Sequence, residues 1–299
     1  MEVITIRTIT DILEGRLSHG PLLPSYNTAK RAYGSVREKC GFKSGGSGSW
    51  LTVPTANTKF SHTVTPTYGW AGLPNIVAFR LAQELGITEY MQALRQVNTC
   101  GNNSAECTKL CINLSGKGIF PAIQRARLAR TIMMVQYPEA AMSLMHGSID
   151  AAVKKHGASG FAFRPDVFTD IIWELGYPAL MERHPDVQFY GYTKHWNRPQ
   201  KPLPNYHLTY SADERISLEA IKDKVALGHN VAVVVNTKRG QPKPDTWRGM
   251  EAVDGDDPVR GDSRYKDPDG VIILLTAKGK ATKAEHVHSK FVWNYWEES

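Results

Sequence analysis

Three of the four cysteines of this chain lie close together in the sequence. Cys100, Cys107 and Cys111 fall within twelve residues and have the spacing Cys-x6-Cys-x3-Cys. Gly101 and the polar residues after it favour a loop, and Cys107 and Cys111 are four residues apart, as on one face of a helical turn. The three thiolates can therefore converge on one point and act as ligands of a metal ion or a cluster.

Three interpretations of this spacing stay open. Three cysteines suit a [4Fe–4S] cluster that keeps one iron without a protein ligand. Structural zinc usually has paired Cys-x2–4-Cys knuckles, and the sequence has no second pair of that kind, so zinc would need Cys40 or a histidine as a further ligand. Unligated structural thiols are the third interpretation. We expect a [4Fe–4S] cluster with Cys100, Cys107 and Cys111 as its ligands.

Helical and strand patterns alternate along most of the chain, and the elements that they predict must position these thiols. Helices are predicted over residues 121–135, 138–155 and 212–227 and over 167–183 with a break at Gly176 and Pro178, and a further helix over 74–97 is interrupted at Gly86. Strands are predicted over residues 161–163, 187–192, 206–210, 231–235 and 271–275. This alternation predicts an α/β fold with a mainly parallel sheet, which we expect to be a partial (β/α) barrel with an irregular N-terminal extension.

Polar side chains follow the ends of the predicted strands. They are Arg164, Asp166, Lys194, Ser211 and Asn236. In parallel sheets the ligand site lies beyond the carboxyl ends of the strands, although strands also end in polar loops for no functional reason. We expect Arg164, Asp166, Lys194 and Ser211 to contact a cofactor or substrate at one shared mouth.

Composition limits the class of protein. Of 299 residues, 41% are hydrophobic and 22% charged, which excludes wholesale disorder. Lys and Arg number 36 against 29 Asp and Glu, so 36 − 29 gives +7, a balance compatible with an anionic partner. Four cysteines are too few for a disulfide scaffold, and no apolar run reaches the roughly 20 residues of a membrane span. The first fourteen residues do not resemble a signal peptide, so we expect a cytoplasmic protein with no membrane partner.

Basic and aromatic side chains are interleaved near the N-terminus, around a Gly-rich loop at residues 41–49. Such a combination can hold single-stranded nucleic acid by charge and stacking, and a solvated basic surface is the alternative interpretation. The side chains are Lys30, Arg31, Arg37, Lys39, Lys43, Tyr26, Tyr33 and Phe42.

The run from residue 98 to 130 resembles a family of uncharacterised phage proteins that are known as numbered gene products. In that family a cysteine-rich segment precedes a Gly-containing turn and an Arg-rich helix, which here are residues 115–118 and the helix from Pro121. The resemblance continues in matching order to about residue 280, and it is strongest at residues 253–256, 262–264 and 267–268.

An aspartate cluster lies in that part of the chain. Alternating carboxylates such as Asp254 and Asp256 can bind Mg²⁺ or Ca²⁺, but the twelfth position counted from Asp254 is Tyr265 and not the glutamate of a calcium loop. Solvated turn carboxylates are the alternative interpretation. The family resemblance implies a role for Asp254 and Asp256 at the barrel mouth, where they join the candidate cofactor-binding residues.

The cysteine loop followed by β/α units is more distantly similar to the radical S-adenosylmethionine superfamily. That similarity implies a [4Fe–4S] cluster on three cysteines in a partial or full barrel, with S-adenosylmethionine as cosubstrate. The sequence departs from the usual Cys-x3-Cys-x2-Cys spacing, and the usual Gly-Gly-Glu stretch has no clear counterpart. Residues 164–166 occupy roughly the place of that stretch.

Two functions from different classes follow. We expect residues 1–70 to form the N-terminal extension and residues 71–299 an α/β iron–sulfur domain. The first function is a phage-type iron–sulfur protein, a redox or radical enzyme acting on a small molecule or a nucleic-acid component. The alternative is a non-enzymatic iron–sulfur or zinc protein that binds nucleic acid or a host protein. A phage origin would place either in the cytoplasm of an infected host cell.

Overall fold

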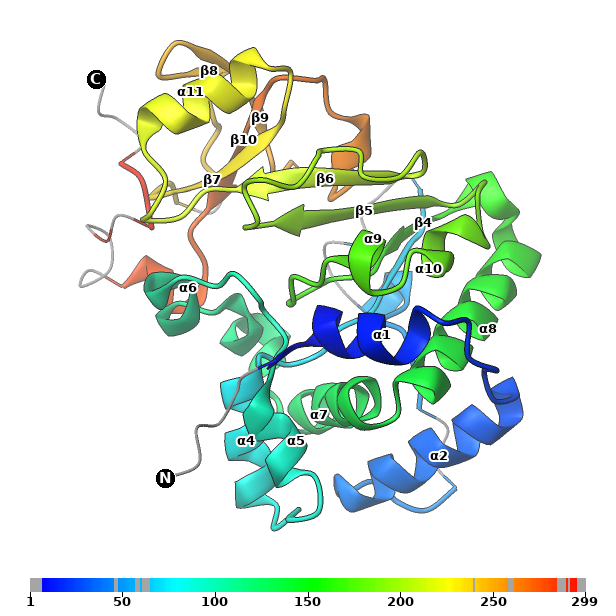
Figure 1. Cartoon of the computed structure of the whole chain (residues 1–299). Helices are drawn as coiled ribbons and strands as arrows, with labels where there is room; N and C mark the ends of the chain where they lie inside the picture. The colour runs from blue at the N-terminus through cyan, green and yellow to red at the C-terminus, as the bar shows by residue number, and fades with distance from the viewer. Residues whose placement is uncertain are drawn as a thin grey trace. The chain divides into compact units, whose positions relative to one another are not determined.

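The computed structural model describes residues 7–45, 48–56, 60, 65–238, 240–257, 261–283, 289 and 291–294 (Figure 1). The chain divides into two compact units, each assembled from segments that are distant in sequence. The first unit consists of Met1–Val53, Tyr68–Gly101 and Lys117–Gln188. The second unit consists of Pro54–Thr67, Asn102–Gly116 and Phe189–Ser299.

The first unit is mainly helical. Among its described residues the helices are α1 (Ile9–Leu17), α2 (Tyr26–Lys39), α4 (Asn75–Glu84), α5 (Met91–Gln96), α7 (Pro121–Gln136), α8 (Pro138–His156), α9 (Trp173–Gly176) and α10 (Ala179–Glu182). Short strands accompany them, namely β1 (Arg7–Thr8), which pairs with β3 (Val97–Asn98), and β2 (Thr67–Gly69), which lies beside β4 (Ala162–Arg164).

Local sequence explains where the long helices begin. Pro121 and Pro138 occupy the first turns of α7 and α8, where a missing N–H costs no hydrogen bond. Thr8 caps α1 by accepting from the backbone N–H of Asp11, whose side chain accepts from the backbone of Thr8 in return. Helix α2 packs against α7 and α8, and the side chains between these helices are buried.

The second unit contains a mainly parallel sheet. Its strand order is β5-β6-β7-β10-β9-β8, in which β8 pairs with β9 antiparallel and the other pairs are parallel. The elements are β5 (Gln188–Thr193), β6 (Tyr206–Ser211), β7 (Val231–Val235), β8 (Thr246–Trp247), β9 (Met250–Asp254), β10 (Ile272–Thr276), α6 (Ala105–Lys109), α11 (Leu218–Ala226) and the 3₁₀ turns η2 (Ile112–Leu114), η5 (Arg264–Lys266) and η6 (Gly279–Thr282).

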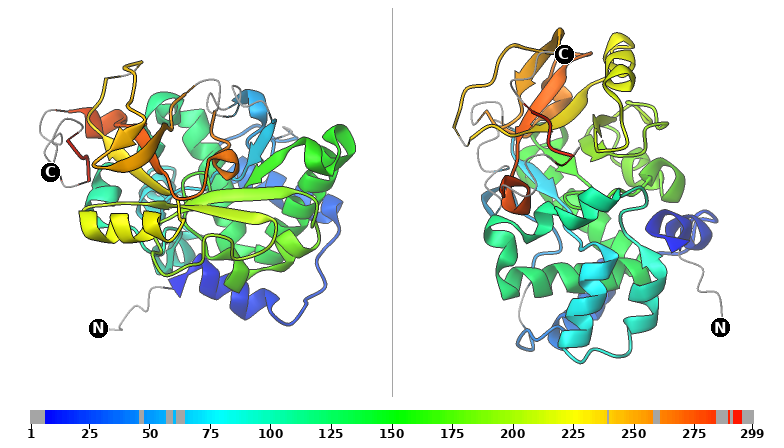
Figure 2. Two further views of the ribbon diagram at one scale, coloured as in Figure 1. Left: turned by 90° about the horizontal axis from the view of Figure 1, so that it is seen from above. Right: turned by 90° about the vertical axis from the view of Figure 1, so that its left-hand side faces the viewer.

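Both faces of this sheet are covered. On one face Tyr210, Val231 and Ile272 pack with Ile221 of α11, which lies along the strands in Figures 1 and 2. On the other face Ala232 and its neighbours on β9 and β10 form a second cluster. Burial on both sides explains why β7 and β10 are continuous apolar runs. The mixed α/β class and the mainly parallel, open sheet confirm the predicted fold class and are consistent with a partial barrel.

Several elements differ from the sequence prediction. The predicted helix at 167–183 begins only at Trp173, and the predicted break at Gly176 and Pro178 separates α9 from α10. The predicted helix at 212–227 begins at Leu218. The connection at 237–268 contains strands β8 and β9, which were not predicted. Residues 1–70 include helices α1 and α2.

Candidate ligand site at the carboxyl edge of the second unit

Two of the predicted site residues lie together where β5 and β6 end. Thr193 of β5 is in register with Tyr210 of β6, so Lys194, which follows β5, and Ser211, the last residue of β6, lie at the ends of neighbouring strands. Lys194 Nζ donates to Ser211 Oγ at 3.1 Å and to the Ser211 carbonyl at 3.3 Å. Lys194 and Ser211 thus meet at the carboxyl edge, and their contact with a cofactor or substrate stays a prediction.

Asp213 completes this cluster, although its role was not predicted. Its side chain is 1% exposed and receives Arg215 Nε at 3.0 Å and Arg215 NH2 at 2.7 Å, with Lys194 Nζ at 3.7 Å. Burial acts to raise the pKa of Asp213, but the Arg215 hydrogen bonds and the Lys194 charge outweigh it and hold the pKa below its usual range. Asp213 is therefore a fixed carboxylate between two cations.

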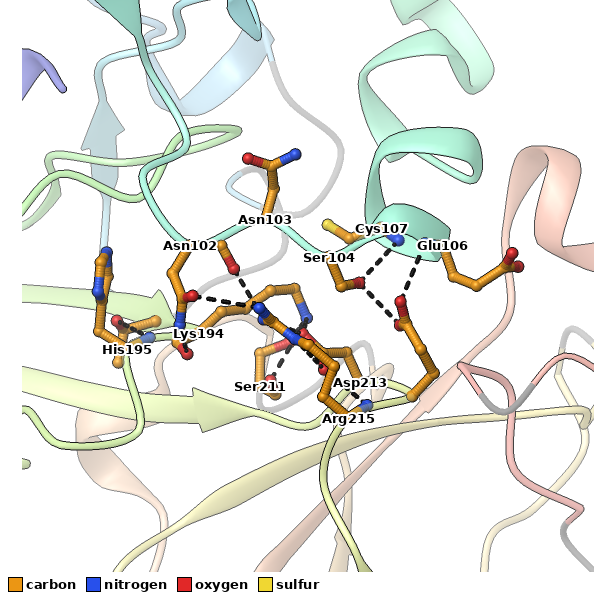
Figure 3. Close-up of polar contacts among 12 residues, drawn as sticks. Asn102, Asn103, Ser104, Glu106, Cys107, Lys194, His195, Ser211, Asp213 and Arg215 are labelled. Carbon is orange, nitrogen blue, oxygen red and sulfur yellow. Dashed lines mark hydrogen bonds and ion pairs between the residues drawn. The ribbon is translucent and has the colours of Figure 1, made fainter. Parts of the chain in front are cut away.

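The connection between β6 and α11 anchors the cysteine segment, as Figure 3 shows. Arg215 NH2 donates to the Asn102 carbonyl at 2.8 Å, and Arg215 NH1 donates to Asn102 Oδ1 at 3.2 Å. Asn102 Nδ2 in turn donates to the Lys194 carbonyl at 2.5 Å. The chain immediately after Cys100 is thereby tied to both β5 and the β6–α11 connection.

A second set of contacts places Cys107. Ser104 Oγ donates to Glu214 Oε2 at 2.7 Å, and the backbone N–H of Glu106 donates to Glu214 Oε1 at 3.1 Å. Ser104 also caps α6 by accepting from the backbone N–H of Cys107 at 3.1 Å. Cys107 therefore sits in the first turn of a short helix whose start is held on the strand ends (Figure 3).

The electrostatic setting of Cys107 mixes burial with nearby charge. Burial raises the pKa of the Cys107 thiol, the positive charge of Lys194 acts to lower it, and Cys111 and Asp213 act to raise it further. Because α6 ends at Lys109, Cys107 and Cys111 do not share one helical face, and that prediction is wrong. Cys111 instead precedes η2 and stays within electrostatic reach of Cys107.

Cys100 belongs to the first unit, where its Sγ donates to the Phe168 carbonyl at 3.4 Å. The residues that the structure describes include no group of three or more His, Cys, Asp or Glu side chains arranged to hold a metal ion. The donor type of the cysteine segment suits an iron–sulfur cluster, but its thiols do not form a ready-made set in the described chain.

Arg164 and Asp166 also belong to the first unit, where they shape the turn after β4. Arg164 Nε donates to the Asp166 carbonyl at 3.0 Å. The Asp166 carboxylate accepts from Trp173 Nε1 at 2.6 Å and from Thr169 Oγ1 at 2.5 Å. These contacts link Asp166 to the side chain that opens α9.

Asp254 and Asp256 form an ion-pair network at the ends of β9 and β10. Lys243 Nζ lies 2.5 Å from Asp254 Oδ1 and 3.5 Å from Asp256 Oδ2, and Lys278 Nζ lies 2.5 Å from Asp256 Oδ1. The backbone N–H of Thr276 adds a bond of 2.7 Å to Asp256. Since the Lys243 side chain is 2% exposed, these carboxylates are not simply solvated turn residues.

Sequence reasoning missed the residues that hold the site together. They lie in one stretch, 213–215, which was assigned to a helix that in fact starts after Ser217, its N-cap. The Ser217 side chain four residues before Ile221 was a usable cap signal. The sequence analysis also gave no role to Arg264, which is fully buried and whose Nε lies 3.3 Å from Asp267 Oδ2.

Comparison with known proteins gives one match. A family model described as gene product 88 matches residues 54–295. Neither curated proteins nor solved structures show a significant match to the chain. Among the described residues no helix is both long and apolar enough to cross a membrane.

Proposed function

The chain belongs to the gene product 88 family, of the phage gene-product type, and we propose that it is an iron–sulfur protein whose cysteine segment works at the carboxyl edge of the second-unit sheet. Cys100, Cys107 and Cys111 are the proposed ligands of a [4Fe–4S] cluster. The proposed activity is redox or radical chemistry on a small molecule or a nucleic-acid component, with S-adenosylmethionine as the cosubstrate that the resemblance implies.

One observation carries this proposal. Two charged side chains, Glu214 and Arg215, reach from the β6–α11 connection and hold residues 102–106 by hydrogen bonds. Such hydrogen bonds fix the orientation of the segment without burying apolar surface, so their main effect is on where the segment lies and less on the stability of the fold. The segment that they orient carries Cys107 and Cys111, and the edge to which it is held is where parallel sheets bind ligands.

The charges at this edge suit the proposed group. A cluster on three thiolates is anionic, and Lys194 and Arg215 supply positive charge close to Cys107. Lys194 also offers Nζ–H donors beside the hydroxyl of Ser211, a combination that suits a carboxylate or phosphate of a ligand. When bound, a cluster would supply one-electron transfer, while these side chains would bind and orient what reacts.

The decisive test is metal content. We expect protein purified without oxygen to contain about four irons and four sulfides per chain and to absorb visible light. Replacing Cys100, Cys107 or Cys111 with Ala should remove the iron. Cys40→Ala is the matched control, because Cys40 is buried in the first unit and burial raises the pKa of its thiol to about 12.

Each other outcome has a definite meaning. About one zinc ion per chain without iron would mean that the metal is structural and not redox-active, and would favour the alternative function, a binding protein. Iron that survives Cys107→Ala would refute the ligand assignment. For the cosubstrate, added S-adenosylmethionine should change the EPR spectrum of the reduced cluster, and an unchanged spectrum would contradict the radical reaction.

A further inference from the structure

Three arginines of the first unit lie against the segment that follows α2, at Gly41, Gly48 and Ser49. Arg130 NH2 of α7 donates to the Ser49 carbonyl at 2.9 Å. Arg125 NH1, also of α7, lies 3.0 Å from where a Cβ on Gly41 would stand. Arg37 NH1 of α2 lies only 1.0 Å from the position of a Cβ on Gly48, so the guanidinium occupies space that glycine alone leaves open.

Within the part of the chain that the structure describes, these guanidinium groups have no paired carboxylate. Among the residues that the structure describes, none of the three arginines forms an ion pair. Arg130 is 9% exposed, and its Nε has no acceptor within the described part of the chain; the same holds for the buried Nε and NH1 of Arg37. A buried cation without an acceptor or counter-charge is costly, because water no longer solvates it.

Aromatic rings position the Arg37 guanidinium but do not accept its N–H hydrogen bonds. Its guanidinium carbon lies 4.3 Å from the Phe42 ring centroid and 5.8 Å from that of Tyr33. Trp50 packs edge-on against Tyr33 at 5.2 Å, and its buried Nε1 also lacks an acceptor among the described residues. Cys40 adds no negative charge, since burial keeps it a neutral thiol. The region therefore offers several N–H donors and a surplus of positive charge.

We propose that Arg37, Arg125 and Arg130, which we call the arginine cluster, bind a phosphate group. The planar fork of a guanidinium matches two phosphate oxygens, and arginines that lie along one segment favour an oxyanion over a neutral ligand. Arg37 and Arg125 are partly exposed, so a phosphate can approach from solvent. Residues 46 and 47 of the connection lie outside the described chain and form no part of this site. The proposal does not depend on the iron–sulfur assignment.

The same chemistry can come from a free nucleotide or from a nucleic-acid strand. The probes are therefore inorganic phosphate, uridine 5′-monophosphate and a fluorescein-labelled oligo-dT of about twelve nucleotides, within the site sizes known for single strands. We expect Arg37→Gln, Arg125→Gln and Arg130→Gln each to weaken binding about tenfold. The matched control is Arg31→Gln, an exposed arginine on the same helix α2, which should leave affinity within twofold.

A charge-neutral variant guards against folding artefacts. Gly48→Ala keeps every arginine but collides with Arg37 NH1, so it should also weaken binding. Gly34→Ala is its control, because a Cβ there meets nothing within 4 Å. Thermal melting of each variant separates lost binding from lost folding.

The outcomes separate the two sources and can overturn the proposal. Tighter binding of the strand than of the monophosphate, with the slope of log K against log salt falling by about one per lost arginine, identifies strand phosphates. Equal binding of the monophosphate and the strand identifies a free phosphate group. If Arg31→Gln weakens binding as much as Arg37→Gln, the affinity is general surface charge and the cluster is not a site. Wild-type protein that binds none of the probes overturns the proposal outright.

Discussion

At the scale of single residues, the candidate site depends on the buried carboxylate of Asp213. Arg215 and Lys194 keep it ionised, because together they lower its pKa by more than burial raises it. Side chains of this kind hold loops in one position at the cost of sensitivity to substitution. Their contribution can be measured separately from any metal or ligand.

Asp213→Asn should lower the free energy of unfolding by about 1–3 kcal/mol, because it leaves two cations beside a neutral amide. Since the folded pKa lies below the unfolded value, the carboxylate stabilises the fold above the usual carboxyl pKa near 3.9 and loses this effect as pH falls through the folded pKa. Urea unfolding at pH 7 and pH 3 measures both effects. Asp223→Asn, at an exposed position on α11, should change neither.

Ser104 links the helix cap of α6 to the position of Cys107. Ser104→Ala removes the bonds to the Cys107 N–H and to Glu214, so we expect a loss of about 1 kcal/mol and faster alkylation of Cys107 by iodoacetamide. Mass spectrometry of each cysteine peptide gives the rate. Ser217→Ala removes the comparable cap of α11 and should cost similar stability without changing the Cys107 rate. If Cys107 is alkylated equally faster in both variants, the cause is a general loss of stability and not the Ser104 contacts.

At the scale of elements, the sequence predicts best where one pattern dominates. Helices α7 and α8 were predicted because a proline opens each and long apolar periodicity follows. Strands β7 and β10 were predicted because burial on both faces demands uninterrupted apolar residues. Strand β9 was missed because Glu251 and the aspartates after it resemble a polar loop.

The contacts of the site could not be predicted in the same way. Lys194 and Ser211 were found because parallel strands bring their ends together, which is a rule of topology. The bonds from Arg215 to Asn102 join residues 113 positions apart, and no local pattern encodes such a pairing. The burial of Arg130 is likewise a long-range effect, because α2 and its following connection cover that side of α7.

A buried pair of histidines, His146 of α8 and His184 after α10, makes the first unit sensitive to acid. His146 Nδ1 lies 2.9 Å from His184 Nε2, and His146 Nε2 lies 3.2 Å from the Tyr177 hydroxyl. Burial, with Arg183 nearby, lowers the pKa of His146 to about 3, and burial also lowers the pKa of His184, against the opposing charge of Asp150. Both rings are therefore neutral in the folded protein at neutral pH.

The sign of the pH dependence follows from this. The unfolded chain takes up protons near pH 6.5 while folded His146 stays neutral to about pH 3, so stability should fall steadily as pH drops below about 6.5. The urea midpoint at pH 7 and pH 5 measures the fall. His146→Gln should make the fall smaller, whereas His19→Gln, at an exposed position, should not. An unchanged slope in His146→Gln would exclude this pair as the cause.

At the scale of the whole molecule, the chain crosses between its two units several times. Residues 102–116 belong to the second unit although the segments on either side of them belong to the first. The second unit therefore receives its cysteine segment as an insertion from an earlier part of the chain. Residues 189–299 alone would lack Ser104 and Glu106, which Glu214 binds, and Asn102, which Arg215 binds. A site of this kind depends on the full chain even though its strands are contiguous in sequence.

The two proposed sites should nevertheless work independently. The arginine cluster is built from contacts within the first unit, whereas Lys194 and Arg215 hold Asn102 within the second. Effects of substitutions that share no partner usually add. Arg37→Gln should therefore leave the iron content unchanged, and Cys107→Ala should leave phosphate affinity within twofold. Measuring both quantities on both variants and on the double variant tests this. For each variant, the change in the free energy of phosphate binding is measured. If the change in the double variant differs from the sum of the two single changes by more than about 0.5 kcal/mol, phosphate binding and the cysteine centre are coupled, and one regulates the other.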